Sequence, residues 1–131
     1  SRQYTVTYPL TDPAGIAKLL RDRHRIAARR ERGDYDACDI ILDLHSAIES
    51  AGLTDRQAEA IALVYGFDLT QEQAARVMGV SQQAVSQFID AACYHIAKVF
   101  EYWAERDGKP EEYTVIYEDY SEGDGDIGET I

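Results

Sequence analysis

The chain is short of several residues and patterns that mark common protein classes. Its 131 residues include two cysteines, one methionine, one tryptophan and three prolines. Cys38 and Cys93 are too few for a disulfide framework or a paired-CxxC metal site, and both lie in segments that read as helix interior. No run of roughly eighteen apolar residues and no leader pattern is present. We therefore expect reduced thiols, no membrane span and a cytoplasmic location.

Basic residues are also scarce, since 13 Lys and Arg face 24 Asp and Glu for a net charge of −11. That balance argues against nucleic-acid binding, because domains that bind DNA usually carry a basic footprint. The charge is uneven, however. Seven of the bases lie between Lys18 and Arg32, and the segment from Glu101 onward has eleven acids against two bases. The first hundred residues are therefore nearly neutral.

Patterns typical of an active site are missing as well. The sequence has no Gly-rich phosphate loop, no nucleophile motif and no His–Glu metal pair. The spacings of Cys38 with His45 and of Cys93 with His95 match no structural zinc site. We therefore expect no enzyme activity, no metal and no cofactor.

Apolar residues at helical spacing predict five helices separated by glycine-containing breaks. The expected helices span residues 13–32, 34–50, 55–65, 70–79 and 81–108. In the third helix the buried positions should be Ala58, Ile61, Ala62 and Val64. The fold class is therefore all-α, with residues 1–108 forming one helical domain.

Two segments near the ends of the chain alternate β-branched and aromatic residues. They are "YTVTY" at residues 4–8 and "YTVIYEDY" at residues 113–120. Such a pattern is typical of strands, which could pair with each other as a small β-ribbon or with copies on another subunit. Residues 109–131 thus form a strand-like segment followed by an acidic, Gly-rich tail that we expect to lack fixed structure.

Residues 70–90 have the spacing of a helix-turn-helix. Ala75 supplies a small residue at the helix crossing, Gly79 permits the turn, and Val85 supplies an inward anchor. The rest of the small core should come from Val77, Met78, Val80 and Phe88. A plain helical hairpin is the alternative interpretation.

The block from Leu53 to Phe100 resembles region four of RNA polymerase sigma factors and the sigma-like regulators of bacteriophages and mobile elements. The resemblance lies in the "LTDRQ" opening, the Tyr65–Gly66 pair, "LTQEQAA", "MGVS" and the long last helix. It implies a DNA-reading module in a bacterial host cell and implies no catalysis.

The outward face of the last helix is polar rather than basic. Gln pairs well with adenine and Ser with bases or phosphates, so the residues expected to read bases are Ser81, Gln82, Gln83, Ser86 and Gln87. The residues expected to contact phosphates are Arg56, Arg76, Arg21, Arg25, Arg29 and Arg32. The last four form a stripe on the first helix, which could instead pair with acids of the second helix or the tail.

The last helix also carries apolar residues at alternating spacings of four and three, from Val85 to Trp103. These residues could simply pack on the protein's own helices. Its carboxy-terminal half extends past what a helix-turn-helix core covers, so the alternative is an oligomerisation surface made of Ile96, Val99, Phe100 and Trp103.

Three functions fit these features. The first is a sequence-specific, sigma-like transcriptional regulator, encoded by a phage, that binds double-stranded DNA and RNA polymerase. The second is the small subunit of a phage DNA-packaging terminase, an oligomer in which residues 113–131 would engage the large subunit. In the third, the helix-turn-helix serves only to bind another protein.

Overall fold

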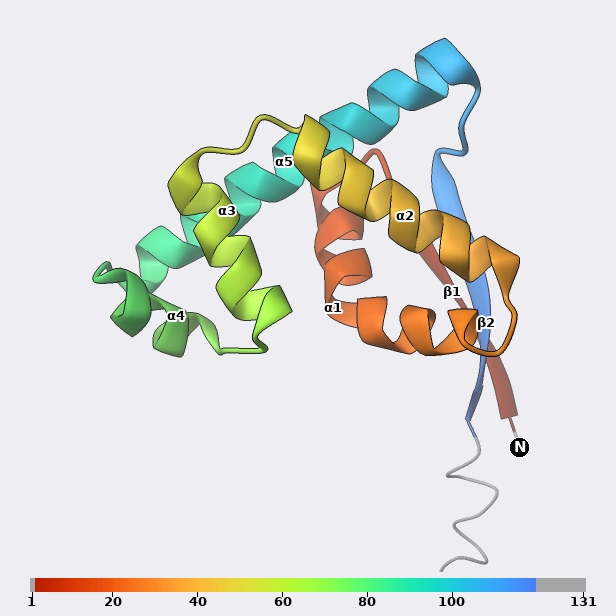
Figure 1. The fold of residues 1–131 in the computed structure, drawn as a ribbon, viewed down its shortest axis with the longest axis horizontal. Coiled ribbons are helices and arrows are strands. Elements are labelled where there is room, and N and C mark those ends of the chain that lie inside the picture. Colours follow the sequence, from red (N-terminus) through yellow and green to blue (C-terminus); the bar gives the residue numbers. More distant parts are fainter. Residues whose placement is uncertain (1, 120–131) are drawn as a thin grey trace, which may run out of the picture.

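The structure is a computed structural model that describes residues 2–119 (Figure 1). Over that range the helices and strands follow one another as β1 (Arg2–Pro9), α1 (Pro13–Arg30), α2 (Tyr35–Ser50), α3 (Asp55–Ile61), the π-helical turn η1 (Ala62–Gly66), α4 (Gln71–Met78), α5 (Gln82–Asp107) and β2 (Glu112–Asp119). The prediction of a helical fold with terminal strands is confirmed. The predicted acidic tail from residue 120 lies outside the described residues.

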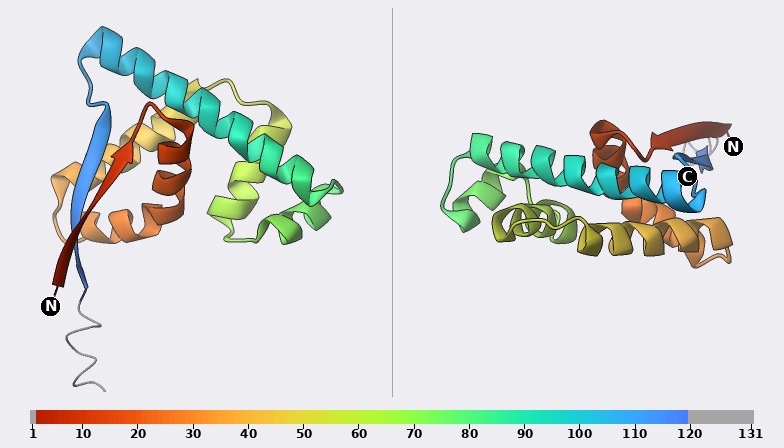
Figure 2. Two further views of the ribbon diagram at one scale, coloured as in Figure 1. Left: turned by 180° about the vertical axis from the view of Figure 1, so that it is seen from behind. Right: turned by 90° about the horizontal axis from the view of Figure 1, so that it is seen from above.

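The two strands form an antiparallel ribbon within the chain. The register runs from Arg2 opposite Asp119 to Pro9 opposite Glu112. Side chains alternate along the ribbon, so Tyr8, Val115 and Tyr117 are buried against the helices. Of the two pairings that the sequence allowed, the structure therefore contains the intramolecular one (Figures 1 and 2).

Local signals explain where the helices begin. Thr54 and Thr70 each accept a hydrogen bond from the backbone three residues on, and the glutamine at that position bonds back to the threonine N–H. These two capping boxes fix the starts of α3 and α4. Asp34 likewise caps α2 by accepting from the Ala37 N–H at 3.0 Å.

The third helix departs from its predicted form. It is α-helical only to Ile61, after which η1 closes with a hydrogen bond from the Phe67 N–H to the Ala62 carbonyl at 2.9 Å. Ala58 and Ala62 are exposed, whereas Ala60 and Ile61 are buried. The predicted burial of Ala58 and Ala62 is wrong because α3 turns a different face toward α5.

The buried side of α5 lies at the centre of the hydrophobic core. Val85, Ala92 and Ile96 are fully buried, and α1, α2, α3 and α4 all contact this helix. Figure 2 shows α5 lying across the other helices. The apolar repeat of α5 therefore packs mainly on the protein's own helices.

This packing corrects the predicted oligomerisation surface. Ile96 has no exposed surface and Phe100 only 2%, so neither side chain can contact another subunit. The prediction failed because Ile96 and Phe100 belong to the hydrophobic core that α5 forms with the other helices. Val99 and Trp103 remain half-buried at the edge of this contact.

The ribbon is fixed to α1 by a polar contact inside an apolar surrounding. The Tyr8 hydroxyl donates to Asp22 at 2.7 Å and lies 2.8 Å from the Tyr117 hydroxyl. Burial raises the pKa of Tyr8, so this hydroxyl stays protonated. Gly15 lets β1 approach α1 closely, because a Cβ there would stand 1.8 Å from the Pro9 carbonyl oxygen.

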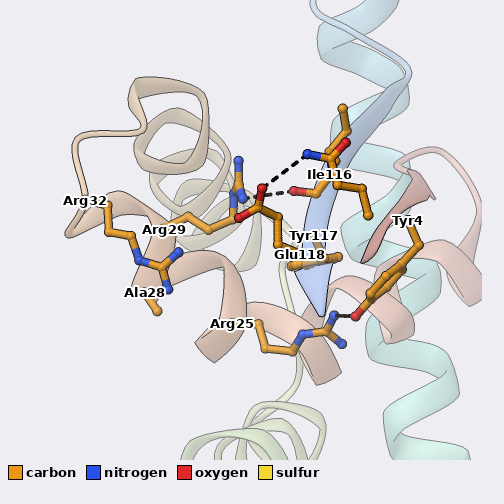
Figure 3. Close-up of a pocket in the computed structure, with 9 residues that line it drawn as sticks. Tyr4, Arg25, Ala28, Arg29, Arg32, Ile116, Tyr117 and Glu118 are labelled. Carbon is orange, nitrogen blue, oxygen red and sulfur yellow. Dashed lines mark hydrogen bonds between the residues drawn. The ribbon is translucent and has the colours of Figure 1, made fainter. Parts of the chain in front are cut away.

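Arginines of α1 make a second connection to the ribbon (Figure 3). The guanidinium of Arg25 lies 3.9 Å from the Tyr117 ring centroid and donates to the Tyr4 hydroxyl at 2.6 Å. Arg29 donates twice to Asp34, at 2.8 and 3.1 Å, and once to the Ile116 carbonyl at 3.0 Å. Arg29 thus joins α1, α2 and β2 through one side chain.

Replacing Arg29 with alanine should lower the free energy of unfolding by about 1–3 kcal/mol, because three hydrogen bonds, two of them to a carboxylate, are lost. Urea denaturation followed by circular dichroism measures the change. Arg32→Ala is the matched control, since Arg32 is an exposed arginine that lines the same surface pocket. Equal losses in the two variants would contradict a structural role for Arg29.

Candidate nucleic-acid interface

The helix-turn-helix consists of α4, a three-residue turn and the start of α5. Gly79 has φ 70° and ψ 35°, the left-handed conformation that ends α4, and the Val80 N–H donates to the Ala75 carbonyl at 3.0 Å. Ser81 then begins α5 by accepting from the Ala84 N–H at 3.0 Å. The bend predicted at Gly79 is confirmed.

Packing inside the bend agrees with the predicted anchors except at one position. Val85 is fully buried, and Ala75 and Met78 are 6% and 5% exposed. Val77, expected in the small core, is 62% exposed. The prediction for Val77 is wrong because Ala74, Ala75 and Met78 form the inner face of α4, and Val77 lies outside it.

A row of polar side chains faces outward from the amino-terminal end of α5. Ser81, Gln82, Gln83 and Gln87 are exposed and Ser86 is half-buried. Ser81 uses its oxygen to cap α5, which leaves its hydroxyl hydrogen free to donate to a ligand. This row, the polar edge, can offer amide and hydroxyl groups to the edges of bases.

Two arginines lie within the helix-turn-helix unit. Arg56 donates to the Met78 carbonyl at 3.1 Å and to Glu59 at 3.3 Å, so it holds the start of α3 against the end of α4. Arg76 lies 3.8 Å from Glu72, with 69% of its side chain exposed. Arg76 is therefore free to turn toward a phosphate, whereas Arg56 already serves the fold.

The predicted arginine stripe on α1 is divided by the structure. Arg25, Arg29 and Arg32 gather beside the ribbon, at the other end of the molecule from α4 (Figures 1 and 3). Arg25 and Arg29 are occupied there by aromatic, carboxylate and carbonyl groups. Arg21 is 65% exposed and lies near Asp22. Arg25, Arg29 and Arg32 are thus not placed beside the polar edge.

The connection between α1 and the helix-turn-helix uses residues that the sequence analysis did not single out. The guanidinium of Arg23 donates to the Tyr65 carbonyl in η1. His24 lies 3.7 Å from Asp68, a residue with φ 58° in the following loop. Sequence spacing gives no signal for these contacts, because they join segments more than forty residues apart.

Two general features complete the description of residues 2–119. No group of three or more His, Cys, Asp and Glu side chains in this range is arranged to hold a metal ion. No helix in the same range combines the length and apolar character of a membrane span.

The turn at Gly79 generates a prediction. Gly79→Ala should lower the free energy of unfolding by about 1–2 kcal/mol, because a side chain disfavours the left-handed backbone even where space is open. Thermal denaturation measures the change. Gly66→Ala is the control, since Gly66 also faces open space but has no positive φ. A loss in Gly66→Ala as large as that in Gly79→Ala would contradict the assigned cause.

Comparison with known proteins gives one match. Residues 51–98 match the family described as Sigma-70, region 4. A search of curated proteins and a search of solved structures each returned no match. The matched residues run from the end of α2 through most of α5 and include the bend and the polar edge. Residues 51–98 are therefore a sigma-70 region 4-like helix-turn-helix, a unit whose family implies DNA binding.

Proposed function

We propose that this protein is a sequence-specific DNA-binding regulator of transcription, encoded by a phage and acting without catalysis in the cytoplasm of a bacterial host. The observation that carries the proposal is the polar edge at the start of α5. A rigid bend sets it outward, and it consists of side chains that can read bases. The family match over the same residues supports it.

The chemistry of the polar edge favours adenine-containing sequences. A glutamine amide donates one hydrogen bond and accepts one, which matches N7 and N6 of adenine in the major groove. Gln83 and Gln87 are one helical turn apart, so both can face neighbouring base pairs. Because α5 is capped and packed along its inner side, these side chains start from a fixed backbone.

Charge limits how tightly one copy can hold DNA. In the helix-turn-helix unit the exposed Arg76 side chain can contact a phosphate, whereas Arg56 is hydrogen-bonded to Met78 and Glu59. Since non-specific affinity depends mainly on the number of phosphates neutralised, a single copy should bind weakly. We infer that the protein binds its site as an assembly, either of several copies or with RNA polymerase, so that weak contacts add through effective concentration.

The terminase interpretation is less favoured by the fold. In that role the segment after residue 112 would engage a partner. Residues Glu112–Asp119 instead pair with β1 along their whole length, and Val115 and Tyr117 are buried.

The remaining alternative is a helix-turn-helix that binds only another protein. Such a protein would show no binding to DNA even at low salt.

Base reading can be tested at Gln83. Gln83→Ala should reduce the preference for the best DNA sequence by about 1–3 kcal/mol while leaving binding to unrelated DNA unchanged, because only base contacts are lost. Fluorescence anisotropy on a sequence selected from a random pool measures both affinities. Gln3→Ala, an exposed glutamine on β1, is the control. Equal weakening on all sequences would contradict base reading by Gln83.

Phosphate contact can be tested separately. Arg76→Ala should weaken binding to every sequence. It should also make the negative slope of log K against log salt shallower by about one, since one phosphate contact is lost. Arg32→Ala should leave the slope unchanged, because Arg32 lies beside the ribbon. If the slope became shallower in Arg32→Ala but not in Arg76→Ala, the end of α1 rather than the helix-turn-helix would contact the DNA backbone.

A further inference from the structure

Asp90 is the one charged residue in the sequence between Ser81 and Tyr94, the part of α5 that contains the polar edge. It is the ninth residue of α5, and its side chain is exposed. This part of the helix lies beside α4 (Figure 1). The base reading proposed above uses amides and hydroxyls and leaves Asp90 without a role. An acid in this place is unexpected, because a surface that approaches phosphates is usually basic.

Helical spacing places Asp90 on the same face as the polar edge. Each residue turns an α-helix by about 100°, so the seven steps from Gln83 to Asp90 return to within about 20° of the same direction. Ser86 and Gln87 lie on either side of Asp90, within about 60° of it. A rise of about 1.5 Å per residue sets Asp90 about 10 Å beyond Gln83 along the axis. Asp90 therefore extends the polar edge by one turn.

The fold makes no use of the Asp90 carboxylate. Within residues 2–119 it forms no ion pair and accepts no hydrogen bond. The groups on which its charge acts are the Tyr65 hydroxyl and the Cys93 thiol, neither of which is cationic. By contrast, Glu59 and Glu72 of the same unit lie 3.3 and 3.8 Å from an arginine nitrogen. A carboxylate left without a partner lowers affinity when a ligand displaces its water, unless the ligand supplies a donor.

The major groove of DNA offers such a donor on one kind of base edge. An ionised carboxylate only accepts hydrogen bonds. Cytosine presents its N4 amino donor, whereas guanine presents two acceptors and thymine presents an acceptor and a methyl group. Adenine has a donor at N6 but an acceptor beside it at N7. A carboxylate on the face that enters the groove therefore favours cytosine over the other three bases.

We propose that Asp90 determines specificity by accepting a hydrogen bond from the N4 amino group of a cytosine. The separation along α5 puts this cytosine about three base pairs, at about 3.4 Å each, from the adenine that Gln83 contacts. This role rests on the proposed function, since it requires α5 to lie in the major groove.

The charge of Asp90 also acts against the wrong sequences. Brought up to the acceptors of guanine or thymine, the carboxylate is repelled, so complexes with those bases at this position are destabilised. The same charge repels phosphates, which weakens binding to unrelated DNA. Asp90 thus raises the ratio of specific to non-specific affinity, the quantity that decides which sites are occupied.

Asp90→Asn in the full chain tests this role. Bound sequences are selected from a random DNA pool for the variant and for the wild-type protein, and fluorescence anisotropy then measures the affinity for each base at each position. An asparagine amide both donates and accepts, as adenine requires. At one position the preferred base should therefore change from cytosine to adenine, by about fivefold or more in relative affinity, with the other positions unchanged. A merely structural residue would not exchange one base preference for another.

Asp39→Asn is the matched control, since Asp39 is an exposed acid on α2 and the substitution changes the net charge equally. It should leave every base preference unchanged. The proposal is overturned if Asp90→Asn keeps the wild-type preference at every position, or if it only strengthens binding to all sequences alike. In either case the carboxylate would act through its charge alone. Circular dichroism establishes that both variants are folded.

Gln83→Ala separates the role of Asp90 from the proposed function. If Gln83→Ala relaxes the preference at one position and Asp90→Asn changes none, base reading stands and the role of Asp90 is refuted. If the wild-type protein binds no DNA, or binds all sequences alike, both are refuted. If the two variants change the same position, the register along α5 is wrong and the proposal fails.

Discussion

The packing of one side of α5 is the interaction on which the rest of the structure depends. Four helices contact it, and its buried residues run from Val85 to Phe100 without a break in the core. Burial of this apolar surface supplies the driving force that short helices such as α3 and α4 lack by themselves. It also orients α5, so the residues on its opposite side are those that partners can reach.

Arginine use explains how an acidic protein can have a cationic first helix. Arg23, Arg25 and Arg29 are engaged by a carbonyl, an aromatic ring and a carboxylate of other elements. Their charges therefore stabilise contacts among α1, η1, α2 and the ribbon. The helix-turn-helix unit therefore keeps few basic side chains available for contact with phosphates.

The outer side of α5 has two parts with different chemistry on one rigid helix. The polar edge carries amides and hydroxyls next to the bend at Gly79, and two cation–aromatic pairs, Lys98 with Tyr94 and Arg106 with Tyr102, lie farther along. Because both parts belong to one continuous helix, the position of one fixes the position of the other.

Local sequence determined the starts and ends of most elements. The capping threonines, Asp34 and Gly79 act on backbone groups within a few residues, so their effect can be predicted without tertiary structure. The exposed positions of Gln82 and Gln83 followed from the same local reasoning. The helix-turn-helix and its family resemblance were therefore available from sequence.

What only the tertiary structure decided involves residues far apart in the chain. Three features depend on the packing of distant elements. They are the pairing of the terminal strands within one chain, the contact of Arg29 with Ile116, and the burial of Ile96 and Phe100. A periodic apolar pattern shows which side of a helix is buried, but it does not say which neighbour covers it. That neighbour is chosen by the whole core at once.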